Sequence, residues 1–373
     1  MTSPQVIPYV DLTAQHAGIK EELLAAVARV LDHGWFILGE EVAEFERRVA
    51  ALVGVPHAVG VNSGTDALVL ALRLHGVGPG DEVITTSHSF VATASAIAMV
   101  GAAPVFVDVD PDTMLMAPAG LADALTDRTR AVMPVHLGGF ACDMDAIAGF
   151  CDAHGLALIE DCAQSIGATW RGRGVGSFGT GAFSLHPLKN LSACGDGGFL
   201  TVRDDAAAER LRRMRNIGLQ TRDSCVEVSG NSRLDTLQAA MLLVKLDHLD
   251  AWTARRRSHA AAYRAAFAGR LRLSPAPPHA QAVYSTFVVR HPRRDALVAG
   301  LLERGVQAKV HYPLAIHQQP AFASPGARLP VTERVVNEIV SLPVTQTLNE
   351  RQRDRVIAAV LDVLKELGDA PLG

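Results

Sequence analysis

Residues 130–161 read RAVMPVHLGGFACDMDAIAGFCDAHGLALIED and contain two apolar runs separated by a helical pattern. The runs RAVMPVHL (130–137) and LALIED (156–161) are nearly continuous in apolar residues, which is typical of strands buried on both faces of a sheet. The intervening DMDAIAGFCDAHG indicates a helix. A strand, a helix and a second strand in this order predict a parallel pair joined by a crossover helix.

The same alternation continues on both sides of this unit. Further apolar runs are HAVGVN (57–62), EVITT (82–86), APVFVDV (103–109), AFSL (182–185) and GFLTV (198–202). The first three are each followed by a helical pattern, near Thr65, Phe90 and 119–125. The chain therefore predicts a mostly parallel sheet, covered by helices on both faces, between about residues 57 and 220.

A second, smaller unit is expected towards the C-terminus. From Leu234, apolar residues recur at three- and four-residue steps for many turns, which predicts a long helix that connects two domains. VYSTFVVR (283–290), VQAKVHY (306–312) and helices near 294–304, 331–340 and 349–366 indicate a small α+β domain. We divide the chain into a large domain, 1–248, and a small domain, 249–373. The first forty residues, with an amphipathic helix near 18–32, are expected to pack against the small domain.

Composition narrows the classes of function. The chain has 373 residues, 49% of them hydrophobic, and a net charge of -4, so nothing favours a nucleic-acid partner. The most membrane-like stretch, 91–107, contains Gly101 and Pro104 and is shorter than the roughly 20 apolar residues of a membrane span. We read it as a buried helix, a break and a buried strand. The N-terminus has no secretory signal pattern. Five scattered cysteines without zinc-like spacing indicate buried thiols in a reducing cytoplasm and no metal site.

Polar residues follow the strands at the carboxyl edge, where ligands bind in parallel sheets. The first strand runs into NSGT (62–65) and a helix, a turn that suits a phosphate, although taken alone it is more often a plain N-cap by Ser63 or Thr65. Asp161 ends a fully apolar run, where a carboxylate needs a cation such as a protonated pyridine nitrogen. Gln164, three residues on, is suited to a ring hydroxyl.

The stretch SLHPLKN (184–190) supplies the reactive group. Ser184 alternates with Phe183 and Leu185, so it is either a phosphate ligand or a core serine bonded to backbone. His186 lies on the same face and is either structural or a substrate contact. Lys189 follows a buried approach, as expected for an amine that forms a Schiff base. Together with Asp161 and the turn at 62–65, it indicates pyridoxal 5'-phosphate (PLP).

These stretches resemble the DegT/DnrJ/EryC1/StrS family of PLP-dependent sugar aminotransferases. The matching segments include VNSGTDALVLAL, GPGDEVITTSHSFVATASAI, VFVDVDPDT, VMPVHLGG, IEDCAQSIGA, FSLHPLKNLSACGDGG, GNSRLDTLQAA and KVHYPLAIHQQ, which cover nearly the whole chain in the family's order. The resemblance implies the aspartate-aminotransferase-like fold (fold type I), with a large, mostly parallel sheet domain and a small α+β domain. It also implies a cytoplasmic homodimer with two shared active sites.

The resemblance carries roles over residue by residue. Gly64, Thr65 and Ser184 match phosphate ligands, and Phe90 matches the aromatic residue that stacks on the cofactor, although core packing explains Phe90 equally. Asp161 and Gln164 match the partners of the pyridine nitrogen and the ring hydroxyl, and Lys189 matches the Schiff-base lysine. Asn231 matches a residue that reaches the phosphate of the neighbouring subunit. Substrate contacts are expected at His186, Arg233, His311, Tyr312 and His317, with interdomain packing, or for Arg233 an ion pair with Asp235, as alternatives.

The implied activity transfers an amino group from L-glutamate, or glutamine, to a keto sugar, with pyridoxamine 5'-phosphate (PMP) as the intermediate cofactor form. Aminosugar and antibiotic biosynthesis is the implied setting. Most relatives use a sugar carried on a nucleotide, and many of these have an aromatic residue where His186 stands. The HPLKNL form resembles a branch that uses free or phosphorylated keto sugars or cyclitols, so both kinds of acceptor stay open.

Three rival functions are weaker. PLP-dependent sugar dehydratases of this kind have histidine at the lysine position, and Lys189 argues against that reaction. PLP-binding regulators of this fold carry a winged-helix module, for which we expect no room before the fold begins. GVGSFG (174–179) matches a dinucleotide fingerprint, but no buried strand precedes it and a strand, not a helix, is expected to follow.

Overall fold

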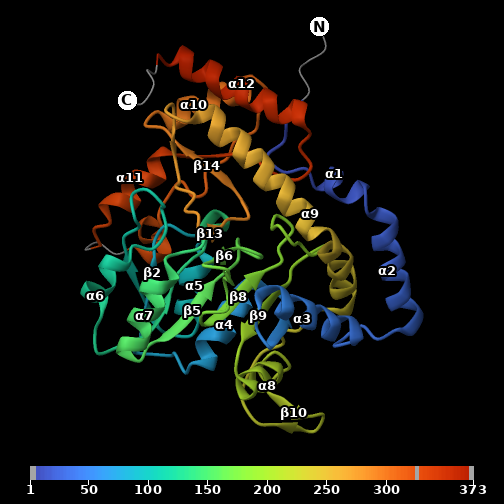
Figure 1. Cartoon of the computed structure of the whole chain (residues 1–373). Coiled ribbons are helices and arrows are strands. Elements are labelled where there is room, and N and C mark those ends of the chain that lie inside the picture. Colours follow the sequence, from blue (N-terminus) through green and yellow to red (C-terminus); the bar gives the residue numbers. More distant parts are fainter. Residues whose placement is uncertain (1–5, 324–326, 369–373) are drawn as a thin grey trace.

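The computed structural model describes residues 6–323 and 327–368. The large domain is built on a seven-stranded sheet with the order β1-β9-β8-β5-β4-β2-β3 (Figure 1). Its strands are β1 (His57–Val61), β2 (Glu82–Thr86), β3 (Ala103–Val107), β4 (Thr129–Met133), β5 (Ala157–Asp161), β8 (Thr180–Ser184) and β9 (Gly198–Val202). Only β9 runs antiparallel to its neighbours, β1 and β8, so the sheet is mostly parallel, as the sequence predicts.

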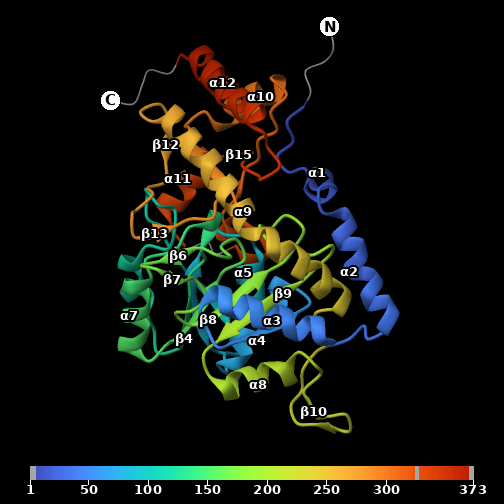
Figure 2. The same cartoon turned by 45° about the vertical axis from the view of Figure 1, so that its right-hand side comes forward.

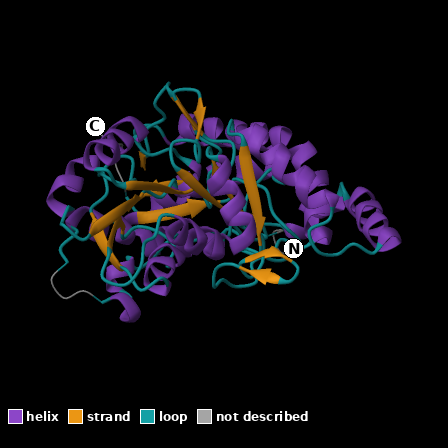
Figure 3. Cartoon of the chain, turned by 90° about the horizontal axis from the view of Figure 1, so that it is seen from below, coloured by secondary structure: helices purple, strands orange, loops and turns teal. Residues whose placement is uncertain are grey.

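Helices cover both faces of this sheet (Figure 3). Helices α3 (Glu40–Val53), α7 (Met144–His154) and the first half of α9 (Thr236–Phe267) contribute to one core, and α4 (Gly64–Leu74), α5 (Ala92–Met99) and α8 (Asp205–Met214) contribute to the other. Neighbouring strand residues alternate between the cores: Phe199 packs in the first and Leu200 in the second. Both faces are therefore apolar, which explains the continuous apolar runs in the sequence.

The small domain has its own core. Strands β12 (Arg272–Leu273), β14 (Phe287–Arg290) and β15 (Ile339–Leu342) form an antiparallel sheet, and α10 (Arg294–Glu303), α11 (Pro330–Glu338) and α12 (Glu350–Glu366) accompany it (Figure 2). The core includes Tyr263 and Phe267 from the end of α9. Helix α9 therefore contributes to both cores, and it runs through the predicted domain boundary at 248/249 without interruption.

Shorter elements complete the described chain. They are α1 (Leu12–Ala17), α2 (Lys20–His33), η1 (Pro118–Gly120), α6 (Leu121–Ala124), η2 (Leu137–Gly139), β6 (Thr169–Trp170), β7 (Arg173–Gly174), β10 (Leu219–Thr221), β11 (Ser224–Cys225), β13 (Ala280–Gln281), η3 (Ile316–Gln318) and η4 (Pro320–Phe322). The GVGSFG stretch lies around the turn from β7 into β8, so a strand does follow it, as the sequence predicts. Within the described ranges, no helix has the length and apolar character to cross a membrane.

Three expectations need correction. The segment 306–312 forms isolated bridges only, and the third strand of the small sheet is β15, which begins where a helix was expected to end. The first forty residues were expected to pack against the small domain, and Ile7 does join its core. Helix α2, however, packs against the first half of α9 through Ala26, Val30 and Ala240, because its apolar stripe faces that part of the helix. Two of the five cysteines, Cys194 and Cys225, are exposed.

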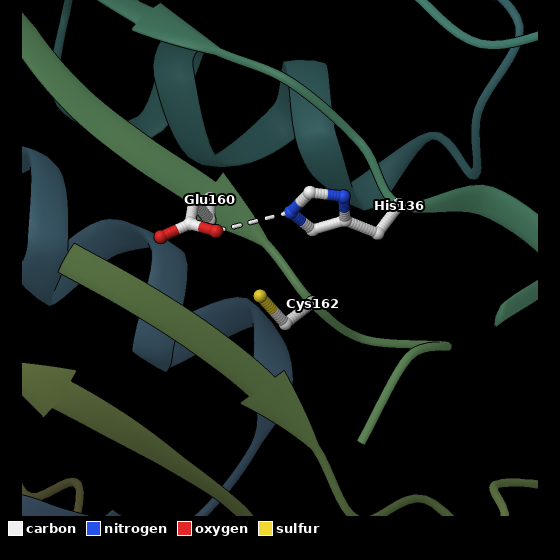
Figure 4. A group of neighbouring side chains, drawn as sticks. All are labelled: His136, Glu160 and Cys162. Atoms are coloured by element: carbon white, nitrogen blue, oxygen red, sulfur yellow. Dashed lines mark hydrogen bonds and ion pairs between the residues drawn. The ribbon is translucent and has the colours of Figure 1, made fainter. Parts of the chain in front are cut away.

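His136, Glu160 and Cys162 form a buried polar cluster at the end of β5 (Figure 4), and this cluster fixes the loop at residues 176–179. The Glu160 carboxylate accepts hydrogen bonds from the backbone N–H groups of Gly176, Phe178 and Gly179, at 2.7, 2.8 and 2.8 Å. His136 Nδ1 accepts from the Cys142 N–H, so His136 Nε2 carries the proton that it donates to Glu160 at 3.2 Å. Cys162 completes a group whose ligand atoms lie within 4.8 Å, a spacing that suits a metal ion. Since Glu160 and His136 already have hydrogen-bond partners, we assign the cluster a structural role.

We predict that Glu160→Gln destabilises the fold by about 2–4 kcal/mol, because the new amide would point donors at backbone donors inside the core. The measurement is the shift of the urea unfolding midpoint. Asp152→Asn, the same change of chemistry on the exposed side of α7, is the matched control and should shift the midpoint negligibly. An unchanged midpoint for Glu160→Gln would show that the loop does not depend on this carboxylate.

Candidate active site

One cavity, of about 420 Å³, lies between the carboxyl edge of the large sheet and the small domain. From the large domain it is lined by residues that the sequence predicts for the site: Gly64, Thr65, Phe90, Asp161, Gln164, Ser184, His186 and Lys189. From the small-domain side, His311 and Tyr312 also line it. Ten of the thirteen predicted site residues therefore meet at one cavity.

The N-terminus of α4 forms one end of this cavity. Ser63 caps the helix by accepting the Asp66 N–H at 3.0 Å, and the first N–H groups of a helix have no acceptor within it. A Cβ added at Gly64 would lie 2.6 Å from the Ser184 Cβ, so the helix start touches the end of β8 because residue 64 lacks a side chain. The arrangement brings the positive end of a helix beside a hydroxyl, which suits an anion.

Asp161 is buried at the end of β5. Its Oδ2 accepts from Thr93 Oγ1 at 2.8 Å, and its Oδ1 accepts from the Ala163 N–H at 3.1 Å. Burial raises the pKa of this carboxyl, against the opposing effects of these hydrogen bonds and of Lys189. A buried carboxylate that is not neutralised favours a cationic ligand in the same cavity.

Lys189 lies in the loop after β8. Burial lowers the pKa of its ammonium, and the nearby Asp161 opposes this effect. The next residue, Asn190, donates its side-chain amide to the Val283 carbonyl at 3.0 Å, which ties the lysine loop to the segment that leads into β14. A lysine with a lowered pKa is more often a neutral amine near neutral pH, which is the nucleophilic form.

The remaining predicted contacts form a wall of rings and polar groups. Gln164 accepts the Gly138 N–H at 2.7 Å and donates to the Tyr312 hydroxyl at 3.3 Å. The Phe90 and Tyr312 rings lie 5.6 Å apart at 39°, and Phe90 is 52% exposed, so core packing does not account for it. Burial lowers the pKa of His311 to about 4 and raises that of Tyr312 to about 12, so both side chains are neutral at neutral pH.

Three predicted residues do not line the cavity of this chain. Arg233 donates to Asn216 Oδ1 at 2.9 Å, in place of an ion pair with Asp235, and Asn231 is exposed on the same segment. His317 is buried and bonds Ser87 Oγ through Nδ1 at 2.7 Å, which joins its loop to the end of β2. The predicted role of Asn231 remains an expectation for an assembly of two chains, and the predicted substrate contact of Arg233 remains an expectation.

The sequence did not indicate several lining residues. Tyr9, Thr93, Asp196, Arg256 and Thr345 all line the cavity. Thr93 was predictable as a polar residue in the first turn of the helix that follows Phe90. Tyr9, Asp196, Arg256 and Thr345 lie in segments that the fold brings to the edge of the sheet, and no local sequence pattern predicts that position.

Comparison with known proteins gives the family. The model of the DegT/DnrJ/EryC1/StrS aminotransferase family matches residues 17–361, and the chain belongs to this family. A "dTDP-3-amino-3,4,6-trideoxy-alpha-D-glucose transaminase" of Streptomyces venezuelae is 43% identical over 370 residues, 98% of each chain. A "Pleiotropic regulatory protein" of Geobacillus stearothermophilus is 43% identical over 364 residues, 95% of this chain and 98% of the other.

Solved structures agree with this assignment. S. venezuelae DesV "in complex with ketimine intermediate" has a TM-score of 0.95 at 44% identity and covers 97% of this chain and 99% of its own. NtdA of Bacillus subtilis "with bound cofactor pmp" has a TM-score of 0.92 at 27% identity and covers 97% of this chain and 86% of its own. The fold is fold type I, and the chain is a sugar aminotransferase of a family whose members work with PLP and PMP.

We predict that Gly64→Ala weakens PLP binding at least about tenfold, because the new Cβ would push the start of α4 away from Ser184. The measurement is an absorbance titration of cofactor-free protein with PLP. Gly149→Ala in the exposed face of α7, where an added Cβ meets nothing within 4 Å, should leave the affinity unchanged. Equal PLP affinities for the two variants would show that the start of α4 does not bind the phosphate of the cofactor.

A second prediction concerns pH. Because the pKa of Lys189 is lowered, the amine of cofactor-free protein should react with pyridoxal at a rate that rises with pH and levels off below 10.5, the ordinary lysine value. Asp161→Asn removes the charge that raises this pKa, so its plateau should begin at lower pH still. Stopped-flow absorbance measures both profiles. A rate that keeps rising to pH 10.5 in the wild type would show an amine of ordinary basicity.

Proposed function

We propose that this chain holds PLP through Lys189 and transfers the amino group of L-glutamate, or of glutamine, to a keto sugar, with the cofactor alternating between PLP and PMP. The observation that carries the proposal is the shared cavity of Lys189, Asp161 and the α4 N-terminus. These groups match the three functional parts of PLP: its aldehyde, its pyridine nitrogen and its phosphate.

The residues of the cavity fit this cofactor. Gly64, Thr65 and Ser184 would hold the phosphate at the helix start, where Gly64 leaves no room for a Cβ. Asp161 would hold the proton of the pyridine nitrogen, Gln164 would contact the ring hydroxyl, and Phe90 would pack against the ring. Asn231 would reach the phosphate held by the neighbouring subunit.

Each side chain then has a defined task. When bound, the cofactor supplies an aldehyde that takes up the amino group and a ring that withdraws electrons from the neighbouring C–H bond. Lys189 would hold the cofactor through Nζ, and the same amine would serve as the base and acid that moves the proton at the donor Cα. Asp161 would keep the ring nitrogen protonated, and its burial would prevent water from weakening that interaction.

For the acceptor, we propose a keto sugar linked to a nucleotide. The supporting observations are the dTDP- and UDP-sugar transaminase names of relatives at 43% identity. The alternative acceptor is a keto sugar phosphate or a cyclitol, because the HPLKNL pattern, with its His186, resembles the branch that uses such acceptors. His186, His311 and Tyr312 are the acceptor contacts we propose, since all three line the cavity. The neutral His311 and Tyr312 side chains are suited to sugar hydroxyls.

We further propose a cytoplasmic homodimer, with the domain boundary near residue 248 and a role in aminosugar or antibiotic biosynthesis. An exposed apolar run, Trp35 to Ile37, supports the dimer, since these side chains are 62%, 44% and 42% exposed. This run lies against the start of α9 through a bridge between Ile37 and Asp235, close to the segment of Asn231. A surface of this kind favours association with a second copy.

The test is an absorption spectrum of the purified protein before and after L-glutamate is added. We expect a yellow band that bleaches towards the PMP form, and no such band in Lys189→Ala, whose turnover should fall at least about a thousandfold. Glutamine serves as the second donor. A colourless protein that remains colourless with added PLP would refute the role of Lys189.

Because one relative at 43% identity is named a regulatory protein, the experiment also tests for a regulatory role of PLP binding. The same spectra separate the two functions. A yellow protein that is indifferent to every amino donor would favour the regulator. A protein that bleaches with glutamate should then be screened with nucleotide-linked keto sugars against keto sugar phosphates, and recovery of the yellow band identifies the acceptor.

A further inference from the structure

Lys245 and Cys194 bring an amine and a thiol into contact outside the active-site cavity. Lys245 lies in the first half of α9 and is fully buried, and Cys194 is exposed in the loop between β8 and β9. Lys245 Nζ donates to Cys194 Sγ at 3.5 Å. Neither residue lines the cavity that contains Lys189, so this pair is a second group of reactive side chains in the molecule.

The other partners of Lys245 are neutral. Its Nζ donates to the Ser192 carbonyl at 2.8 Å and lies 2.8 Å from His16 Nε2. His16 Nδ1 lies 2.7 Å from the Leu12 carbonyl oxygen, so Nδ1 carries the ring proton and Nε2 accepts from Lys245. Among the described residues, Lys245 forms no ion pair with a carboxylate. Burial lowers the pKa of Lys245, which raises the share of neutral amine, the nucleophilic form.

The second exposed cysteine has different surroundings. Cys225 Sγ donates to the carbonyl oxygens of Ile217 and Glu227, both at 3.3 Å. An amine can displace a leaving group from an oxidised sulfur, whereas a carbonyl oxygen cannot. Within the part of the chain that the structure describes, Cys194 is the exposed cysteine that has a lysine amine as a hydrogen-bond partner.

We propose that Cys194 and Lys245 form a site of reversible covalent modification, at which a hydroperoxide joins the two side chains through an S–N bond. With hydrogen peroxide, the sulfur first attacks one oxygen, and the O–O bond breaks to give a sulfenic acid and one water. Lys245 Nζ then attacks the sulfur, the S–O bond breaks, and the leaving oxygen takes a proton from the nitrogen to form a second water. The sulfur loses two electrons and the peroxide gains them.

The reverse reaction needs a thiol reductant. Two thiols give up two electrons to become one disulfide, and their two protons restore the Cys194 thiol and the Lys245 amine. The modification is therefore reversible, whereas oxidation of a cysteine to sulfinic acid is not reversed by thiols. The nearby amine thus protects Cys194 from further oxidation.

The site is connected to the loop that carries Lys189. Cys194 lies between Lys189 and Asp196, and both of these residues line the active-site cavity. A covalent S–N bond is much shorter than the 3.5 Å contact, so its formation requires one side to move. Lys245 is buried on a packed helix and Cys194 is exposed, so the loop is the side that moves. We expect this movement to slow the reaction of Lys189 with aldehydes.

The first experiment is peptide mapping by mass spectrometry of the peroxide-treated protein, digested with trypsin without reductant. Residues 190–203 and 234–255 should be joined, with Lys245 uncut and a mass lower by two hydrogens than the sum of the two peptides. Dithiothreitol should separate them. Sulfinic acid at Cys194 without the cross-link, or a disulfide from Cys194 to another cysteine, would overturn the proposal.

Variants at the two exposed cysteines form a matched pair. Cys194→Ser should abolish the cross-link, and Cys225→Ser should give it at the wild-type yield. Lys245→Arg keeps a cation but replaces the amine by a guanidinium, which is always protonated, so Cys194 should accumulate as sulfinic acid. Because this last change alters a buried residue, the cysteine pair decides the test if Lys245→Arg does not fold. A cross-link that persists in Cys194→Ser would refute the assigned site.

The effect on the loop is measured as the rate at which cofactor-free protein reacts with pyridoxal. Peroxide treatment should slow wild type at least about threefold, since a displaced amine attacks less often in the right geometry, and dithiothreitol should restore the rate. Cys194→Ser should not respond to peroxide. An unchanged rate in cross-linked protein would refute the connection to Lys189. The mass measurement does not depend on the aminotransferase function, so a cross-linked chain that forms no Schiff base would refute that function alone.

Discussion

A buried carboxylate and a half-buried amine share one cavity, and much of the architecture serves to keep them there. Asp161 ends β5, the middle strand of the sheet, and the Val135 bridge and the β8 pairing hold its backbone on both sides. Because side chains alternate along a strand, Glu160 and Asp161 point to opposite faces. Glu160 fixes the loop at 176–179 from behind, while Asp161 faces the cavity. One strand thus supplies a structural carboxylate and a cavity-lining one in consecutive positions.

The cavity also depends on the small domain, and α9 connects the two halves. Its early residues pack with the large sheet and its last turns pack in the small-domain core, so the helix sets the distance between them (Figure 1). Arg256 lies on the same helix, between these two regions. His317 adds a second connection by bonding Ser87 at the end of β2, close to the loop that carries His311 and Tyr312. Residues of both domains are therefore held at fixed positions around Lys189.

Sequence patterns predict the large sheet closely, because strands buried on both faces are apolar throughout: EVITT and GFLTV coincide with β2 and β9. The strand β15 escaped prediction because its apolar residues follow α11 directly and prolong the helical pattern. Site residues at strand ends were predictable for the same topological reason that ligands bind there. Arg256 was not, since it stands in the charged run TARRRSH, which reads as a solvated face. Only the packing of α9 on both cores determines that the middle arginine is buried while Arg255 is exposed.

Among the described residues, the partners of Arg256 are neutral. Carbonyl oxygens of Tyr284 and Ser285 and the amide oxygen of Gln346 orient the cation without neutralising it. A buried guanidinium held only by neutral oxygens is costly, so the part of the cavity wall that α9 supplies favours an anionic group. Burial keeps His311 and Tyr312 neutral in the same cavity, so one charged position and two neutral side chains stand side by side in its lining.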